Sequence, residues 1–154
     1  MINNLKLPFL LIFIYIINVI SLNISYPIYL IGFVFYIWTK TAKNKYFILW
    51  PISMLVVIEI NFGFYIFSTV IISYLIYHYV VPFVSRYLNF NKESKISLVL
   101  LFYLFFMFYL IYFYNIKTEL FFNIMFNIVF DIVLIFIFFR EKRKKQNFKG
   151  DFSL

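Results

Sequence analysis

The longest apolar runs of the chain set the strongest limit on its fold. One of them, ISLVLLFYLFFMFYLIYFY, covers residues 96–114 without a charged side chain. A helix of about 20 apolar residues crosses the ~30 Å hydrocarbon core of a bilayer. A membrane-spanning β-strand would instead alternate polar and apolar residues over about ten positions. Because backbone polar groups in lipid must pair internally, such unbroken runs predict membrane-spanning α-helices.

The composition excludes an ordinary soluble domain. Hydrophobic residues make up 65% of the 154 residues and charged residues 13%, whereas soluble domains carry about 25% charged residues. The chain has no cysteine, which excludes disulfides, thiolate metal sites and thiol catalysis. The sequence therefore predicts an integral membrane protein.

Breaks at polar and turn residues divide the chain into six apolar segments. The stretch over residues 46–84 would measure about 58 Å as one helix, nearly twice the thickness of the hydrocarbon core. It must therefore contain a turn, which is best placed at Asn61–Gly63, where Gly63 supplies the glycine. We expect an all-α membrane domain over residues 1–139 with six transmembrane helices. The predicted spans are 6–22, 26–39, 46–60, 64–84, 96–115 and 119–139. Their short connections predict antiparallel packing of consecutive helices.

The basic residues predict the orientation of these spans. With the amino terminus in the cytoplasm, 13 of the 14 Lys and Arg residues lie on the cytoplasmic side and Lys117 alone lies outside. Cytoplasmic loops of membrane proteins carry such an excess of Lys and Arg. Six spans then place both termini in the cytoplasm.

A basic tail follows the last span over residues 140–154. Its cluster consists of Arg140, Lys142, Arg143, Lys144 and Lys145. A short cluster beside a span typically anchors the cytoplasmic end of the helix. Contact with anionic lipid headgroups or with an acidic cytoplasmic partner is the alternative. Nucleic acid is not predicted as a partner.

Polar residues within the spans are functional candidates because they are costly in lipid. The helical rise places them in two sets. The outer polar layer, which could bind a partner or a ligand, consists of Glu59, Asn18, Asn61 and Asn123. The deep polar face consists of Asn127, Asp131 and His78.

Each set has a structural and a functional interpretation. Asn123, Asn127 and Asp131 are spaced four residues apart and share one face of the last span. They could form interhelical hydrogen bonds or serve a ligand, a proton or a partner. Glu59 could be hydrated or hydrogen-bonded at a hairpin tip, or act from the outer side. His78 could be a side chain of the cytoplasmic interface. We expect the fifth span to be the most exposed to lipid.

Nothing in the sequence predicts an enzyme. The one histidine lacks a nucleophile context, and two carboxylates at one level are absent because Glu59 and Asp131 differ by roughly 13 Å in depth by helical rise. A metal site needs several His, Cys or carboxylate ligands together. We therefore expect no catalytic residues, no metal and no cofactor.

The order of several residues resembles a known family. A proline opens the second span, an acid ends the third, and a glycine turn and STVIISYLI follow. This order is similar to that of the rod shape-determining protein MreD family, small bacterial inner-membrane proteins with the order P, D, G and YL. Pro27, Glu59, Gly63, Tyr74 and Leu75 stand at the matching positions. The last span, with Asn127 and FFREKRKK, also resembles the end of that family. Glutamate stands where the family has aspartate, and the glycines before the acid are missing.

The resemblance implies a non-enzymatic scaffold in the bacterial inner membrane. Its partners would be membrane lipids and other membrane proteins, including an MreC-like periplasmic coiled-coil protein and further components of peptidoglycan elongation and cell-shape determination. The fold of the family is thought to be similar to that of the substrate-binding subunits of energy-coupling-factor vitamin transporters. The alternatives are therefore such a subunit, with an outer pocket lined by Glu59, Asn18 and Asn123, or an accessory subunit of another membrane complex.

Overall fold

The computed structural model describes residues 6–23, 27–42, 46–87, 95–114 and 118–139. Within these ranges every regular element is helical. The elements are α1 (Lys6–Ser21), α2 (Ile31–Thr41), α3 (Leu49–Phe62), α4 (Ser68–Leu75), the π-helix η1 (Ile76–Val80), α5 (Val81–Tyr87), α6 (Lys95–Tyr114) and α7 (Thr118–Phe138). Because α4, η1 and α5 follow one another without a gap, they form one segment, which makes six helical segments. The predicted all-helical class with six helices is confirmed.

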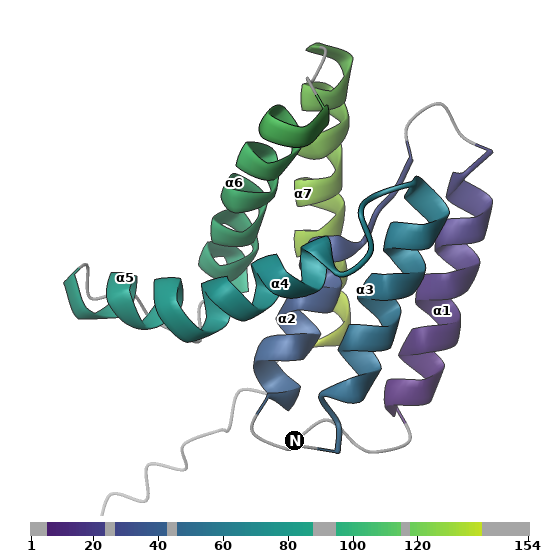
Figure 1. The fold of residues 1–154 in the computed structure, drawn as a ribbon. Helices are drawn as coiled ribbons and strands as arrows, with labels where there is room; N and C mark the ends of the chain where they lie inside the picture. Colours follow the sequence, from purple (N-terminus) through teal and green to yellow (C-terminus); the bar gives the residue numbers. More distant parts are fainter. Residues whose placement is uncertain (1–5, 24–26, 43–45, 88–94, 115–117, 140–154) are drawn as a thin grey trace, which may run out of the picture.

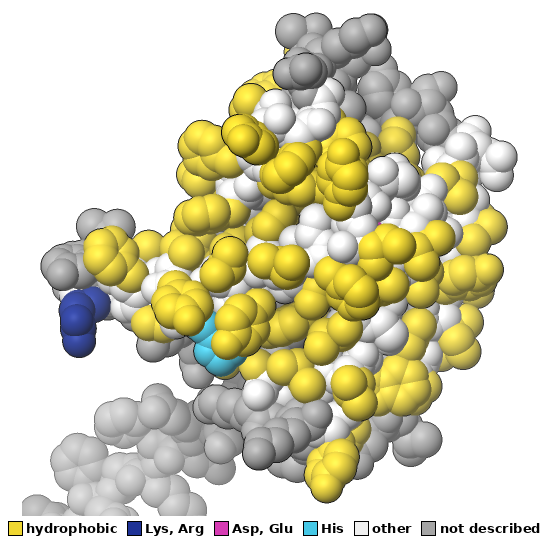
Figure 2. All heavy atoms as spheres, viewed as in Figure 1, with side chains coloured by type: hydrophobic (Ala, Val, Ile, Leu, Met, Phe, Trp, Pro, Cys, Tyr) yellow, Lys and Arg dark blue, Asp and Glu magenta, His cyan; other side chains and the backbone are white. Residues whose placement is uncertain are grey.

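Two of the described helices are long and apolar enough to cross a membrane: α6 over Ile96–Tyr114 and α7 over Phe121–Phe138. The helices over residues 7–21, 49–62 and 68–84 are also apolar but shorter. Exposed large hydrophobic side chains occur on every helical segment except α2. The face drawn in Figure 2 is accordingly covered largely by hydrophobic side chains. A soluble monomer rarely exposes such extended apolar surface, so this surface fits contact with lipid or with other membrane proteins.

Helix α2 forms the centre of the molecule. It packs against α3 on one side and against α6 and α7 on the other, and it also contacts α4. Figure 1 shows α3 between α2 and α1, and α6 and α7 as a pair of helices that extends beyond α2. All eight residues from Ile31 to Trp38 are buried. A helix that is apolar on all sides is stable in such a central position because every face meets a neighbour.

The segment formed by α4, η1 and α5 is oriented differently from the predicted fourth span. In Figure 1 it runs across the molecule at a steep angle to α1, α2 and α3. Its first part contacts α3 and α6. The prediction that consecutive helices pack antiparallel is therefore wrong for α3 and this segment. The physical reason lies at its start, where a side chain of α3 fixes the first turn of α4, as described below.

The second predicted span is helical over its second part only. Residues 27–30 are not helical, and α2 begins at Ile31 rather than at residue 26. Leu30 precedes α2 in the left-handed conformation with φ of 60°. The 11 residues of α2 rise about 16 Å, half of a bilayer core. Residues 27–30 continue the chain without helical structure, so a half-helix and a non-helical segment together take the place of the predicted helix.

The turn after α3 contains the predicted glycine. Gly63 follows Phe62 with φ of 70°, and the N–H of Phe64 donates to the carbonyl of Glu59 at 2.9 Å. This is the usual way in which a glycine in the left-handed conformation ends a helix. Residues 64–67 are not helical either, and α4 begins at Ser68, so the connection is longer than the predicted one over Asn61–Gly63.

Candidate functional site

The carboxylate of Asp131 lies at the beginning of α2. Asp131 is fully buried on α7. Its Oδ2 accepts hydrogen bonds from the backbone N–H of Phe33 at 3.1 Å and from the hydroxyl of Tyr103 at 2.7 Å. The first N–H groups of a helix have no partner within the helix, and the partial positive charge there favours an anion. Asp131 thus caps α2 from a neighbouring helix.

Two asparagines of α7 hold the non-helical segment that precedes α2. Asn127 accepts from the N–H of Tyr29 through Oδ1 at 2.6 Å and donates through Nδ2 to the carbonyl of Pro27 at 2.9 Å. Asn123 donates to the hydroxyl of Tyr29 at 3.0 Å. Unpaired backbone groups at membrane depth cost several kcal/mol each. One polar stripe on α7 therefore makes the non-helical segment possible.

We call Asn123, Asn127, Asp131 and Tyr103 the α2 clamp. All four side chains are buried, and together they hold residues 27–33. The three α7 residues follow the spacing of one helix face, and Tyr103 approaches Asp131 from α6. The α2 clamp therefore joins α2, α6 and α7 through hydrogen bonds within an otherwise apolar core.

Gly32 allows these helices to come close. A Cβ atom at this position would lie 2.6 Å from Cε2 of Tyr103, 2.7 Å from Oδ2 of Asp131 and 3.2 Å from Cγ1 of Val99. Contacts below 3.0 Å essentially never occur for real Cβ atoms. The absence of a side chain at Gly32 is thus a condition for the hydrogen bond between Tyr103 and Asp131.

Glu59 caps the start of α4, as Asp131 caps the start of α2. It is fully buried near the end of α3. Its Oε2 accepts from the N–H of Phe67 at 2.7 Å, and its Oε1 accepts from the N–H of Thr69 at 2.5 Å and from the hydroxyl of Thr69 at 2.6 Å. The hydroxyl of Ser68 is a weaker donor at 3.3 Å. Like Leu30 before α2, Phe67 before α4 is left-handed, with φ of 67°.

The other members of the predicted outer polar layer do not share a site with Glu59. Nδ2 of Asn18 donates to the carbonyl of Ile14 in its own helix at 3.0 Å, and Asn61 is half-buried near the end of α3. In the part of the chain that the structure describes, no hydrogen bond joins Glu59, Asn18, Asn61 and Asn123 to one another. Asn123 belongs to the α2 clamp instead. The structure thus distributes this predicted layer over several elements.

The deep polar face contains Asn127 and Asp131 but not His78. His78 is exposed in the π-helix η1, where its ring centroid lies 4.5 Å from that of Tyr74 and 5.1 Å from that of Tyr77. Placing His78 with Asp131 is therefore wrong, because the segment of η1 leaves the bundle at a steep angle instead of returning beside α7. The basic cluster of Arg140, Lys142, Arg143, Lys144 and Lys145 lies outside the described residues.

Sequence reasoning missed Tyr103 and Gly32. It expected the fifth span to be the most exposed to lipid, but Tyr103 on α6 is 1% exposed and bonded to Asp131, and α6 packs against α2, α4 and α7. The tyrosine is one of several on α6, so nothing in its local sequence distinguishes it. The sequence did contain a signal for Gly32, because glycine is rare in this chain. The described part contains two glycines, Gly32 and Gly63.

The buried acids of these sites act as hydrogen-bond acceptors. Among the described residues, no group of three or more His, Cys, Asp or Glu could hold a metal ion. The acids Glu59 and Asp131 each accept backbone N–H groups at the start of a helix. Comparisons of the chain with known protein families, with curated proteins and with solved structures find no match.

Proposed function

We propose that the protein is a non-enzymatic scaffold subunit of the bacterial inner membrane that binds other membrane proteins. The observation that carries this proposal is the use of both buried acids: Asp131 holds the start of α2 and Glu59 holds the start of α4. The interior polar groups thus support the fold, while the outward surface offers apolar side chains on five of the six helical segments. Such a surface suits protein and lipid contacts within a membrane.

The proposed topology has six membrane crossings, of which the inclined segment of α4, η1 and α5 is the fourth, with both termini in the cytoplasm. The support is the distribution of Lys and Arg, of which 13 of 14 would face the cytoplasm. In this topology α2 with residues 27–30 forms the second crossing, buried in protein as non-helical backbone must be.

Single cysteines test this topology because the chain has none of its own. In intact cells, a membrane-impermeant maleimide should label Asn23→Cys, while Lys40→Cys should react only after the membrane is made permeable. Both positions are exposed. Labelling of Lys40→Cys in intact cells would exclude the proposed orientation.

Within this class, we propose a role like that of the MreD family in cell-shape determination and peptidoglycan elongation. The support is the residue order of Pro27, Glu59, Gly63, Tyr74 and Leu75. Three of these positions have structural tasks: Pro27 accepts from Asn127, Glu59 caps α4, and Gly63 ends α3. Tyr74 and Leu75 are each 48% exposed on α4, so they are available to a partner such as an MreC-like coiled-coil protein.

The transporter alternative requires an outer pocket with a free Glu59. Both oxygens of Glu59 accept hydrogen bonds from α4 and its preceding turn. A ligand that used this carboxylate would have to replace those bonds, and each buried N–H left without a partner costs about 1–3 kcal/mol. The geometry of Glu59 therefore favours the scaffold.

Co-purification from native membranes tests the scaffold function. After mild cross-linking, we expect the tagged chain to bring down membrane proteins of the elongation machinery, including a coiled-coil protein. The double variant Tyr74→Ala/Leu75→Ala should reduce their yield, while Ile16→Ala on α1, which is similarly exposed at 49%, should not. Recovery of an ATPase pair instead would favour the transporter, and recovery of no partner would contradict both.

A further inference from the structure

Phe64 lies between the two capped helix starts. It follows the turn at Gly63 and is half-buried. Its ring centroid lies 5.6 Å from that of Tyr29, which precedes α2, and 5.6 Å from that of Phe106 on α6. Both pairs meet edge to face, and aromatic pairs at such distances attract each other beyond the effect of burial. Phe64 therefore packs at once against the segment before α2 and against α6.

The contact with Tyr29 leads to two members of the α2 clamp. Tyr29 is buried. Its N–H donates to Oδ1 of Asn127, and its hydroxyl accepts from Nδ2 of Asn123. Its ring centroid also lies 4.8 Å from that of Phe62, so the residues before and after Gly63 both pack on it. A shift of this ring therefore displaces the groups that the two asparagines bind.

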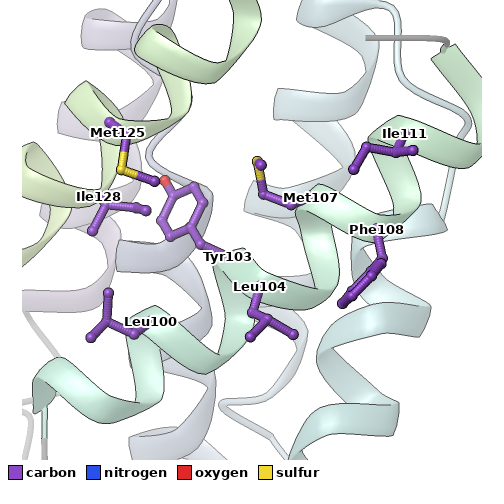
Figure 3. A pocket seen from close by; sticks show the side chains of 8 residues that line it. All are labelled: Leu100, Tyr103, Leu104, Met107, Phe108, Ile111, Met125 and Ile128. Carbon is purple, nitrogen blue, oxygen red and sulfur yellow. The ribbon is translucent and has the colours of Figure 1, made fainter.

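The contact with Phe106 leads to the other two members of the α2 clamp. Phe106 is fully buried, and its ring centroid lies 6.3 Å from that of Tyr103, one turn earlier on α6. Figure 3 shows Tyr103 on α6 opposite Met125 and Ile128 of α7. Its hydroxyl donates to Asp131 of the same helix α7. Two series of side-chain contacts thus lead from one phenylalanine to all four members of the clamp.

Glu59 fixes Phe64 relative to α4. Its backbone carbonyl accepts from the N–H of Phe64 at 2.9 Å, and its side chain accepts from the N–H groups of Phe67 and Thr69. One residue of α3 therefore holds both Phe64 and the first turn of α4. Residues 64–67 are not helical, so the placement of the Phe64 ring depends on the bonds at both ends of this connection.

From these contacts we propose that Phe64 couples the cap of α4 to the α2 clamp, so that loosening either one loosens the other. Energetic coupling between separate sites is carried by packed side chains and hydrogen bonds that connect them, and both connect these two sites. In the proposed scaffold, α4 carries Tyr74 and Leu75, so a partner bound there sets how firmly α2 is held. That consequence rests on the proposed function, whereas the coupling within the chain does not.

Hydrogen exchange at single amides tests the coupling in the full chain, reconstituted into lipid nanodiscs without a partner. Glu59→Gln replaces one acceptor oxygen by an NH2 group, so the amides of Phe67 and Thr69 should exchange about tenfold faster. The amides of Tyr29 and Phe33 donate to the α2 clamp. They should exchange about fivefold faster in the same variant, at the lower end of typical coupling between sites.

The opposite change provides an independent measurement. Because coupling between two sites is reciprocal, Asn127→Ala should speed the exchange of the Thr69 amide about fivefold as well. The amides of α1 over residues 10–17 should keep their rates in both variants. Faster exchange there by the same factor would show that the whole fold opens, and it would overturn the proposal.

Two substitutions of phenylalanine provide the matched comparison. In a Phe64→Leu background, Glu59→Gln should still speed the exchange at the start of α4 but should change that of Tyr29 less than about twofold, because leucine lacks the ring that contacts Tyr29. Phe113→Leu should preserve the fivefold effect, because the ring of Phe113 packs on other tyrosines. An unchanged rate of Tyr29 in Glu59→Gln alone, or a full effect in the Phe64→Leu background, would contradict the coupling.

Discussion

Replacement of Asp131 by alanine is expected to lower the free energy of unfolding by about 2–4 kcal/mol. The substitution removes the acceptor for the N–H of Phe33 and for the hydroxyl of Tyr103. Both donors then remain buried without a partner, and the start of α2 loses its side-chain acceptor. The measurement is denaturation in mixed micelles, followed by the fluorescence of Trp38 on α2.

Trp38 is a suitable reporter because it is 2% exposed and becomes the sole tryptophan in a Trp50→Phe background. Val133→Ala is the matched control on α7: Val133 is 48% exposed, so the change should stay within about 0.5 kcal/mol. In a double-mutant cycle, Asp131→Ala and Tyr103→Phe should couple by roughly 0.5–2 kcal/mol. A loss for Asp131→Ala no larger than that for Val133→Ala would refute the capping of α2.

Replacement of Gly32 by alanine is expected to destabilise the protein by about 2–3 kcal/mol. The added Cβ would lie 2.6 Å from the ring of Tyr103 and 2.7 Å from the carboxylate of Asp131. One of the two side chains must move, and the hydrogen bond between them lengthens or breaks. We expect a lower denaturation midpoint and an altered Trp38 emission, because α2 shifts away from α6.

Gly63→Ala separates this steric effect from the general cost of replacing glycine. At Gly63 a Cβ would meet nothing within 4 Å, but φ is 70°, so the expected loss is about 1–2 kcal/mol from backbone strain alone. In the Tyr103→Phe background, Gly32→Ala should cost less than in the wild type, because the hydrogen bond is already absent. Equal losses in both backgrounds would show that Gly32→Ala does not act through the hydrogen bond of Tyr103, because phenylalanine keeps the ring atom Cε2.

Several parts of the fold could be predicted from local sequence. The positions of the six helical segments follow from the lengths of the apolar runs, because an apolar helix needs no distant partner to satisfy its backbone. The turn at Gly63 follows from length and composition, since a continuous helix over residues 46–84 would be too long for a bilayer. The shared face of Asn123, Asn127 and Asp131 follows from helical spacing.

The interrupted second span could not be predicted in the same way. Residues 27–30 read PIYL, which is as apolar as the helices around them. Their backbone partners lie about 100 positions away, as in the bonds of Asn127 to Pro27 and Tyr29. The same holds for Tyr103, whose role depends on a carboxylate of another helix. Local sequence patterns do not show which distant residues pair, because the pairs depend on how the helices are arranged.

The sequence by itself determined that this chain is a helical protein suited to a membrane, because its long apolar runs can satisfy their backbone groups only within helices. It also determined which side chains are costly in that setting. The tertiary structure alone decided what those side chains do. It brings Asp131 and Glu59 to the N–H groups at the starts of α2 and α4 that have no partner within their helix, where each buried side chain accepts hydrogen bonds from another segment of the chain.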